Sequence, residues 1–401
     1  MGLPVRVVFF TYGDNNQWSF VVYRKHPVIR PGFVRRMGMI RHDEAVAAAK
    51  ALGLLPGDLI FLGYPDFGTL HMWNDYWAAR PPFRSMLTRV TAVPYPNALR
   101  PGALYKGDEV LQDLTTVLRE FRPTKVFVSH PADHMPDHLA LYLFTRVALW
   151  DLESELTPEL YPYLVHFTFK RWPTPRGDHP DKALTPPPSF AQQIAWQIHP
   201  LSSQQIERKR AALKAHRTQY STSATYLRSF LRTNELFGDF PVFTLRPPAS
   251  TASLALDGTP HAIGTPEELT DVERAAFVGI EVRSAQIDNE ALTLTIEFSR
   301  PLAQAVEASV YAFGYRRDHP FAHMPKLHLK LGAATHEVYD QDRRLPPGRV
   351  QITRAPKQIV FRVPLDLLGN PERVLVSARS YLGEVPLDWV SWRVLELAPK
   401  R

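Results

Sequence analysis

The sequence predicts an α/β fold, with a Rossmann-like and mostly parallel sheet, followed by an all-β antiparallel sandwich domain. Three observations support this fold class. Short apolar runs alternate with amphipathic helical segments up to about residue 170, the hydrophobic period changes to two from about residue 273, and the 401 residues exceed one ordinary core. Strands that alternate with helices favour a parallel sheet covered on both faces, whereas successive strands favour a sandwich.

The first domain is expected to span residues 1–245. Val5 to Phe10 is a run of β-branched and aromatic residues that ends in a turn, as a buried parallel strand does. Apolar residues at helical spacing, closed by Gly53, predict the first helix. In chain order we expect strands at 5–10, 59–63, 125–129 and 161–169, helices at 41–52, 108–121 and 137–150, and a helical pair within 201–237.

Two long loops separate these elements, one from Trp18 to Arg36 and the other from Asp66 to Lys106. Both leave the carboxyl end of an expected strand, which is where open α/β sheets bind ligands. Loops of this length in a compact domain are usually functional. Residues 172–190 are rich in proline and are expected to wrap the surface.

A linker is expected at 246–272 and the sandwich at 273–401. Leu292, Leu294 and Ile296 alternate with polar residues, which is the pattern of a strand with one buried face. Similar runs, separated by turn residues, occur at 307–313, 326–331, 358–363, 373–379 and 392–397. No helical pattern intervenes, so the region is predicted to be an antiparallel sandwich.

The composition excludes several classes of protein. The chain has no cysteine, so any metal is held by His, Asp and Glu. No stretch is apolar over the ~20 residues that a membrane helix needs, and no signal-peptide pattern occurs. We therefore expect a cytoplasmic protein with no membrane span. The net charge of +7 comes from scattered residues, so no nucleic acid partner is expected.

The residues that carry chemistry are concentrated between Ser129 and His138, in the sequence SHPADHMPDH. This segment follows the third expected strand and opens the third helix, with Pro136 suited to the first helical position. His138 then lies in the first turn, where the helix dipole favours the neutral imidazole that a metal needs. Asp133 and Asp137 are candidates for orienting a ligating ring. Simple helix capping is the alternative explanation for such residues.

One dependable ligand is too few for a catalytic zinc site. Such sites have about three protein ligands, and hydrolysis also needs a base. Asp14 and Asp66 are carboxylates at neighbouring strand ends, so either is a candidate to complete the site.

Four stretches together resemble the LmbE-like N-acetylglucosaminyl-phosphatidylinositol de-N-acetylase (PIG-L) family. They are VRVVFFTYGD at 5–14, RHDEAVAAAKALG at 41–53, FLGYPD at 61–66 and FRPTKVFVSHPADHMPDHLA at 121–140. The resemblance covers roughly residues 4–240 and implies a Rossmann-like fold. It also implies removal of acetyl groups with zinc or another divalent metal, so the expected partner is a small molecule or glycan that carries an N-acetyl sugar.

The resemblance implies roles for single residues. It makes His138 a zinc ligand, aligns Arg41 with a family arginine associated with the sugar substrate, and aligns Asp66 with a family carboxylate that follows a strand. Met135 stands where the family has a histidine that stabilises the transition state, a role that methionine cannot take. Neighbouring His134 is the candidate substitute. The expected site therefore comprises His138 as metal ligand, Asp137 and His134 as catalytic residues, and Arg41, Asp66 and Asp14 as substrate-binding residues.

The family's first motif, His-Pro-Asp-Asp, has no counterpart in the chain. The resemblance places that motif on a strand before Val5, in mid-sheet, and gives it two zinc ligands and the general base. Two interpretations follow. Either Met1 is an internal start and the natural chain begins further upstream, or the motif has been lost and the protein binds sugar without turnover.

We therefore expect a zinc-dependent N-deacetylase with half of its metal site missing from this chain. The alternatives are a non-catalytic carbohydrate-binding protein and a metal-free structural protein. The segment from Pro386 through Trp389 to Trp392 loosely resembles the sandwiches of carbohydrate-binding modules, in which exposed aromatic rings stack on sugars. Shielding of the first domain is the other role considered for the sandwich.

Overall fold

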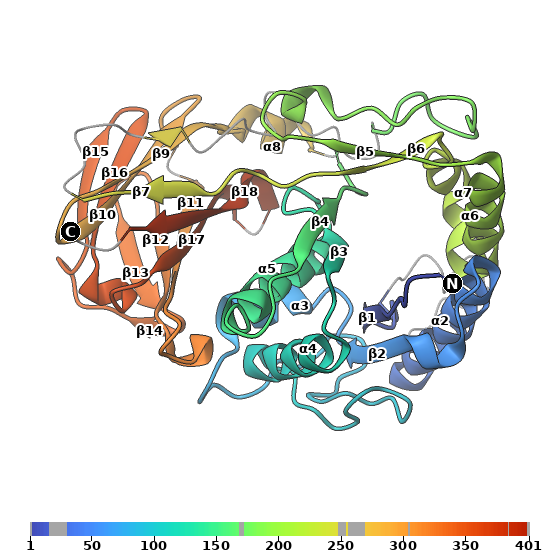
Figure 1. The fold of residues 1–401 in the computed structure, drawn as a ribbon. Coiled ribbons are helices and arrows are strands. Elements are labelled where there is room, and N and C mark those ends of the chain that lie inside the picture. Colours follow the sequence, from blue (N-terminus) through green and yellow to red (C-terminus); the bar gives the residue numbers. More distant parts are fainter. Residues whose placement is uncertain are drawn as a thin grey trace. The chain divides into compact units, whose positions relative to one another are not determined.

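A computed structural model describes residues 2–15, 30–167, 172–247, 254–255, 269–303, 305–383 and 385–398. The chain divides into two compact units (Figure 1). The first comprises Met1–Pro187 and Trp196–Gly238, and the second comprises Pro188–Ala195 and Asp239–Arg401. The second unit therefore includes a short segment that interrupts the first unit along the chain.

The first unit contains two pairs of parallel strands. β1 (Val7–Thr11) pairs with β2 (Leu59–Tyr64), and β3 (Lys125–Ser129) pairs with β4 (Glu159–Tyr163). Each pair is a separate sheet, and a short third sheet pairs two further strands, β5 (Gln197–Pro200) and β6 (Asn234–Phe237), in antiparallel orientation. The unit is mixed α/β as predicted, but its described part has fewer parallel strands than the expected single sheet.

The difference from the prediction lies in which strands pair. β1 and β3 each have one edge that pairs with no strand in the described part of the chain. Apolar runs predict where strands form, but the choice of partner depends on contacts that are distant in sequence. One helix nevertheless connects the two sheets. α5 (Pro136–Asp151) packs beside β3, and its Phe144 meets Phe10 of β1 edge to face, with ring centroids 5.9 Å apart.

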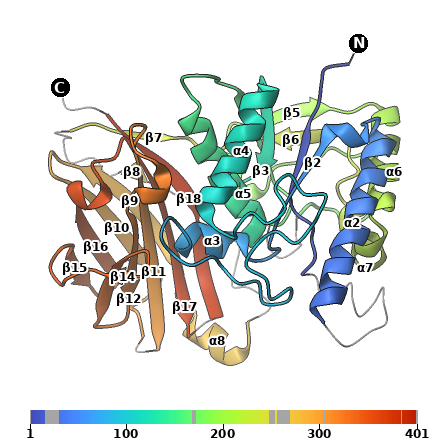
Figure 2. The same cartoon turned by 90° about the horizontal axis from the view of Figure 1, so that it is seen from below.

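The remaining helices of the first unit form two groups, which Figures 1 and 2 show in two orientations. α3 (Thr69–Asp75) and α4 (Gly107–Phe121) both pack on α5. α2 (Pro31–Leu52) packs on α6 (Ser203–Ala215), and α7 (Arg217–Arg228) follows α6. α6 and α7 are the helical pair that the sequence predicts, although the end of that range forms β6.

Local sequence explains where these helices begin and end. Pro136 occupies the first turn of α5, where its missing N–H costs little. Gly53 ends α2 with a φ of 90°, a conformation that favours glycine. α2 begins at Pro31 instead of the predicted Arg41, so the end of the loop expected at 18–36 is helical. Residues 18–29 of that loop lie outside the described residues.

The other elements of the first unit agree with the sequence to different degrees. β3 has the predicted bounds, and α4 begins one residue early. α3 lies within the loop expected from Asp66 to Lys106. β4 covers 159–163 instead of the predicted 161–169, and residues 168–169 lie outside the described part.

The second unit is built from two sheets that are almost entirely antiparallel. Their strand orders are β15-β16-β10-β9-β8 and β14-β13-β12-β11-β17-β18-β7, and only β18 and β7 pair in parallel. The first sheet comprises β8 (Leu254–Ala255), β9 (Ile280–Ile287), β10 (Ala291–Phe298), β15 (Gln351–Ala355) and β16 (Gln358–Pro364). The second comprises β7 (Phe243–Leu245), β11 (Val306–Tyr315), β12 (Lys326–Leu331), β13 (His336–Asp340), β14 (Arg343–Arg344), β17 (Arg373–Leu382) and β18 (Val385–Leu397).

The two sheets share one apolar core. Leu292, Leu294 and Ile296 of β10 are buried in the same cluster as Val310 and Leu329 of the other sheet. Alternate residues of a strand point to opposite faces, so the two-residue period places the apolar set on the inner face. The antiparallel β region that this period predicts is therefore present, and β9, β13 and β15 are strands that the sequence analysis missed.

Most of the linker predicted at 246–272 lies outside the described residues. β8 and the start of α8 (Asp271–Ala276) fall within that range, and short 3₁₀ turns occur at Pro56–Asp58, Pro188–Phe190, Phe321–His323 and Asp366–Leu368. Among the described helices, none has the length and apolar character needed to span a bilayer.

Candidate metal centre

The carboxyl ends of the parallel strands carry the predicted site residues. Asp14 follows β1, Asp66 follows β2, and the segment from Ser129 to His138 follows β3. β4 ends at Tyr163 and is followed by His166. Ionisable side chains therefore follow each of the four parallel strands described in the first unit, at the ends where such sheets bind ligands.

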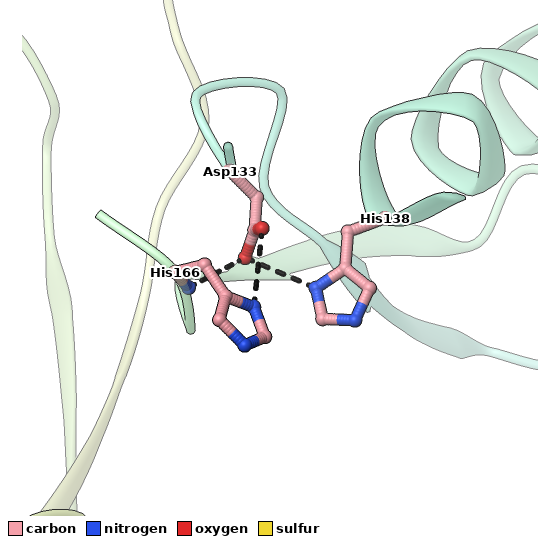
Figure 3. Close-up of side chains that lie close together, drawn as sticks. All are labelled: Asp133, His138 and His166. Atoms are coloured by element: carbon pink, nitrogen blue, oxygen red, sulfur yellow. Dashed lines mark hydrogen bonds and ion pairs between the residues drawn. The ribbon is translucent and has the colours of Figure 1, made fainter. Parts of the chain in front are cut away.

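Asp133, His138 and His166 form a compact cluster (Figure 3). The His138 Nδ1 atom lies 3.1 Å from Asp133 Oδ2, and the His166 Nδ1 atom lies 3.5 Å from Asp133 Oδ1. One potential ligand atom from each residue lies within 4.8 Å of the other two. The Asp133 carboxylate is fully buried, while the two imidazole rings are about one-third exposed, at 34% and 31%.

Backbone amides hold Asp133 in place. Its Oδ1 atom accepts a hydrogen bond from Met135 N at 3.0 Å, and its Oδ2 atom accepts from Val165 N at 3.1 Å and from His166 N at 2.9 Å. Asp133 therefore connects the loop after β3 with the loop after β4. His138 is positioned separately, by the first turn of α5.

The charges of the cluster depend on each other. Burial alone would raise the pKa of Asp133, but His138 and then His166 hold it well below its ordinary range, so the carboxylate is ionised. Burial lowers the pKa of His138, but Asp133 outweighs that effect, with help from Asp137 and Asp66, and the net pKa is raised. The carboxylates around His138 thus favour positive charge at this ring, unlike the neutral imidazole expected from the helix dipole.

The donor set fits a metal ion. Both Nδ1 atoms are buried, and neither makes a hydrogen bond of ordinary geometry with the described residues, although each lies close to the Asp133 carboxylate. Two imidazoles and one carboxylate form a ligand type that suits zinc and related divalent metals. A bound metal would satisfy both buried nitrogens.

Asp137 is not part of the cluster, because its carboxylate binds the turn that follows β2. Its carboxylate accepts hydrogen bonds from Phe67 N at 2.6 Å, from Thr69 N at 3.3 Å and from the Thr69 hydroxyl. Burial raises its pKa to about 7, and the neighbouring Asp66 adds to that effect. Asp66 in turn accepts from Asn15 N at 3.0 Å. The structure thus brings Asp137 and Asp66 together, next to His138, as a pair that holds the turn after β2.

Arg41 and Asp14 are also neighbours, at the end of β1. The Arg41 guanidinium donates to the Gly13 carbonyl and, at 3.3 Å, to the Thr218 hydroxyl. The Asp14 carboxylate accepts from the Tyr95 hydroxyl. Burial raises the pKa of Asp14 to about 7 and lowers that of Arg41, and both side chains interact electrostatically with Asp66. The predicted substrate residues are therefore connected to one another, but Arg41 and Asp14 are buried.

His134 lies beside the cluster without joining it. Its ring packs against Phe167, with centroids 5.3 Å apart, and burial lowers its pKa to about 4, so the imidazole is neutral. Its backbone N–H donates to the His166 carbonyl at 2.9 Å. Met135, at the position where the resemblance has a histidine, is the residue that precedes α5. His130 is buried and stacks on Trp196.

His166 is the functional candidate that the sequence analysis missed. The apolar residues Val165 and Phe167 on either side of it continue the strand pattern, which predicts a strand over 161–169. The structure ends β4 at Tyr163 and puts His166 in the following loop. The detectable signal was its position: it is a histidine shortly after a strand parallel to β3.

Comparisons with known proteins support the family resemblance. Residues 1–149 match the family described as PIG-L: GlcNAc-PI de-N-acetylase. The solved structures that match include the crystal structure of the conserved protein TT1542 from Thermus thermophilus. It is 20% identical, with 63% of this chain and 100% of that chain covered, at a TM-score of 0.31. So low a TM-score supports no comparison of the two sites. No curated protein matches the chain.

Proposed function

We propose that the protein is a metal-dependent N-deacetylase acting on an N-acetylated sugar or glycoconjugate, because residues 1–149 match the PIG-L family. One observation carries the proposal. The matched segment contains His138, the metal ligand that the resemblance implies, and this residue lies in a cluster of donors that could hold a metal.

The chain's own residues divide into two groups around this centre. A divalent metal at such a site polarises an acyl carbonyl and lowers the pKa of bound water. Asp133 and His138 are held on the metal side by the loop after β3 and by α5. On the other side we assign the Asp66 carboxylate to the sugar hydroxyl groups, and the buried Arg41 and Asp14 to supporting it from behind.

The catalytic roles of Asp137 and His134 stay predictions. Asp137 holds the turn that carries Asp66, and this contact gives it a positioning role toward the substrate side. His134 is a neutral imidazole next to the cluster, and its one N–H is a possible donor to a reacting carbonyl.

Sugar binding without turnover is the alternative function. Of the Trp and Tyr side chains that the structure describes in the second unit, none is exposed; Trp389 is half-buried and Trp392 is buried. Stacking of sugars on exposed rings of the sandwich therefore has no support among these residues, and the first unit is the better candidate for recognition.

Acetate release tests the proposal. The full chain, loaded with zinc, is incubated with N-acetylglucosamine, its glycosides and N-acetylglucosaminyl-phosphatidylinositol, and free acetate is measured. We expect release that is lost in His138→Ala and kept in the control His199→Ala, which changes an exposed histidine of β5. Sugar binding by calorimetry with no acetate from a metal-loaded protein would instead favour the binding function.

A further inference from the structure

We propose that Asp133, His138 and His166 together form a complete three-ligand metal site, in which His166 supplies a ligand from outside the family match. The matched residues end at 149, so they include Asp133 and His138 but not His166. The resemblance takes two ligands from a His-Pro-Asp-Asp motif. In this chain we assign the two other ligands to Asp133 after β3 and His166 after β4.

The spacing of the donors fits a small tetrahedral ion. Metal–ligand bonds of about 2.0–2.1 Å put neighbouring ligand atoms about 3.3 Å apart in a tetrahedral site. His166 Nδ1 lies 3.5 Å from Asp133 Oδ1, which is close to this value, and His138 Nδ1 lies 3.1 Å from the other oxygen of the same carboxylate. The ligand atoms of the two histidines lie within 4.8 Å of each other, and both rings are partly exposed.

The hydrogen bonds of Asp133 indicate which oxygen binds. A carboxylate oxygen has about two lone-pair directions. Oδ2 uses both of them on the amides of Val165 and His166, whereas Oδ1 accepts one bond, from Met135 N. Oδ1 therefore keeps one direction for a metal. The proposed site is one monodentate carboxylate and two Nδ1 atoms, so a four-coordinate ion would have one position for water or substrate.

The hydrogen bonds of Asp133 hold the loops that carry the ligands in a fixed position. Its three amide bonds fix the two ligand-bearing loops relative to each other, and the His134 N–H bond to the His166 carbonyl adds a fourth connection. Bonds of this kind orient metal ligands, and their loss typically lowers metal affinity about 10–100-fold. Loss of a ligand itself should cost at least as much.

Cobalt titration tests the ligand set directly. The full chain is stripped with a chelator and titrated with Co²⁺, followed by visible absorption, and then with Zn²⁺ by calorimetry. We expect one equivalent of metal and the intense visible bands of a four-coordinate Co²⁺ site. His138→Ala and His166→Ala should each lower the affinity by about 100-fold or more, whereas His199→Ala should bind as the wild type does.

His166→Ala is the decisive variant, because its ring is partly exposed and the chain should fold without it. Thermal melting of the metal-free variant checks this, and His166→Gln serves as a second variant if alanine disturbs the loop. Full affinity and an unchanged Co²⁺ spectrum in both folded variants would overturn the proposal. Failure to bind any Co²⁺ or Zn²⁺ would also overturn it.

The three-ligand site rests on the proposed deacetylase function, but different results would contradict the site and the function. One equivalent of metal that depends on His166, with no acetate released from any substrate, contradicts the deacetylase and supports the site. Acetate release and metal binding that both survive His166→Ala contradict the ligand set and leave the deacetylase standing.

Discussion

Asp14 should make the first unit less stable as the pH rises. Burial is the largest cause of its raised pKa of about 7; the hydrogen bond from Tyr95 opposes the shift and the charge of Asp66 adds to it. In the unfolded chain this carboxyl has its ordinary pKa of about 3.8. The folded state therefore holds a proton that the unfolded state has lost between these two values. The contribution of Asp14 to the free energy of unfolding is therefore fully present below pH ~4. It decreases between pH ~4 and ~7 and does not change further above pH ~7.

The size of the effect follows from the two pKa values. A difference of about three pKa units corresponds to at most ~4 kcal/mol, at ~1.4 kcal/mol per unit. For a domain of about 150–250 residues, 1 kcal/mol moves Tm by ~2–4 °C, so the upper limit is a fall of ~8–16 °C. Asn keeps an acceptor for Tyr95 without the charge, so Asp14→Asn should remove this part of the pH dependence.

Calorimetry of the wild type and Asp14→Asn between pH 4.5 and 8 measures the effect. The quantity of interest is the change in Tm of the first unit with pH, compared between the two proteins, because other groups titrate equally in both. Asp181→Asn, at an exposed aspartate of the same unit, is the matched control and should follow the wild type. Parallel Tm profiles for Asp14→Asn and the wild type would refute the reasoning.

Three further substitutions test the packing of the two units. Asp113→Ala leaves the buried Tyr64 hydroxyl without its acceptor at 2.7 Å, and should lower the free energy of unfolding of the first unit by ~2–3 kcal/mol in urea titrations. Thr218→Val removes the hydroxyl that donates to Glu44 at 2.7 Å, for an expected loss of ~1–3 kcal/mol; an unchanged midpoint would contradict this role. Leu294→Ala opens a cavity in the sandwich core and should cost ~2–5 kcal/mol, with a calorimetric shift confined to the second unit.

The sequence predicted those features that depend on local pattern. β3 has the predicted bounds because an apolar run is bounded by a turn on each side, and α5 begins at Pro136 because proline suits that position. His138 accordingly lies in the first turn of α5, as expected. Its role as a ligand is a separate matter, which the metal titrations test.

Features that depend on distant contacts were not predictable. Val165 and His166 continue a strand pattern, but their amides donate to Asp133, more than 30 residues away, instead of to a neighbouring strand. β4 therefore ends early and His166 becomes available to the cluster. The pairing of β1 with β2 alone, and of β3 with β4 alone, is likewise a long-range choice that no apolar run encodes. β9 was missed for a related reason: Arg283, a charged residue in mid-strand, is buried and donates to the Ser391 carbonyl.

In the metal-free protein, substitution of Asp133 should lower the free energy of unfolding more than substitution of either histidine of the cluster. Asp133→Ala removes the acceptor of three amide N–H groups, whereas His138→Ala and His166→Ala remove rings that make no ordinary hydrogen bond through Nδ1. A bond to a charged acceptor contributes ~1.5–3 kcal/mol, so Asp133→Ala should cost ~3 kcal/mol or more in chelator. The histidine variants should cost less than Asp133→Ala, because they remove a charge beside the Asp133 carboxylate but leave its three amide hydrogen bonds in place.

Amide hydrogen exchange shows which part of the chain is destabilised in Asp133→Ala. In chelator, the amides of Val165 and His166 should exchange faster in Asp133→Ala than in the wild type, because their acceptor is gone. In His138→Ala the exchange of both amides should be unchanged. Equal protection of these amides in Asp133→Ala and the wild type would mean that the carboxylate does not hold the two loops together. The rigidity attributed to the cluster would then have to come from α5 and β4 alone.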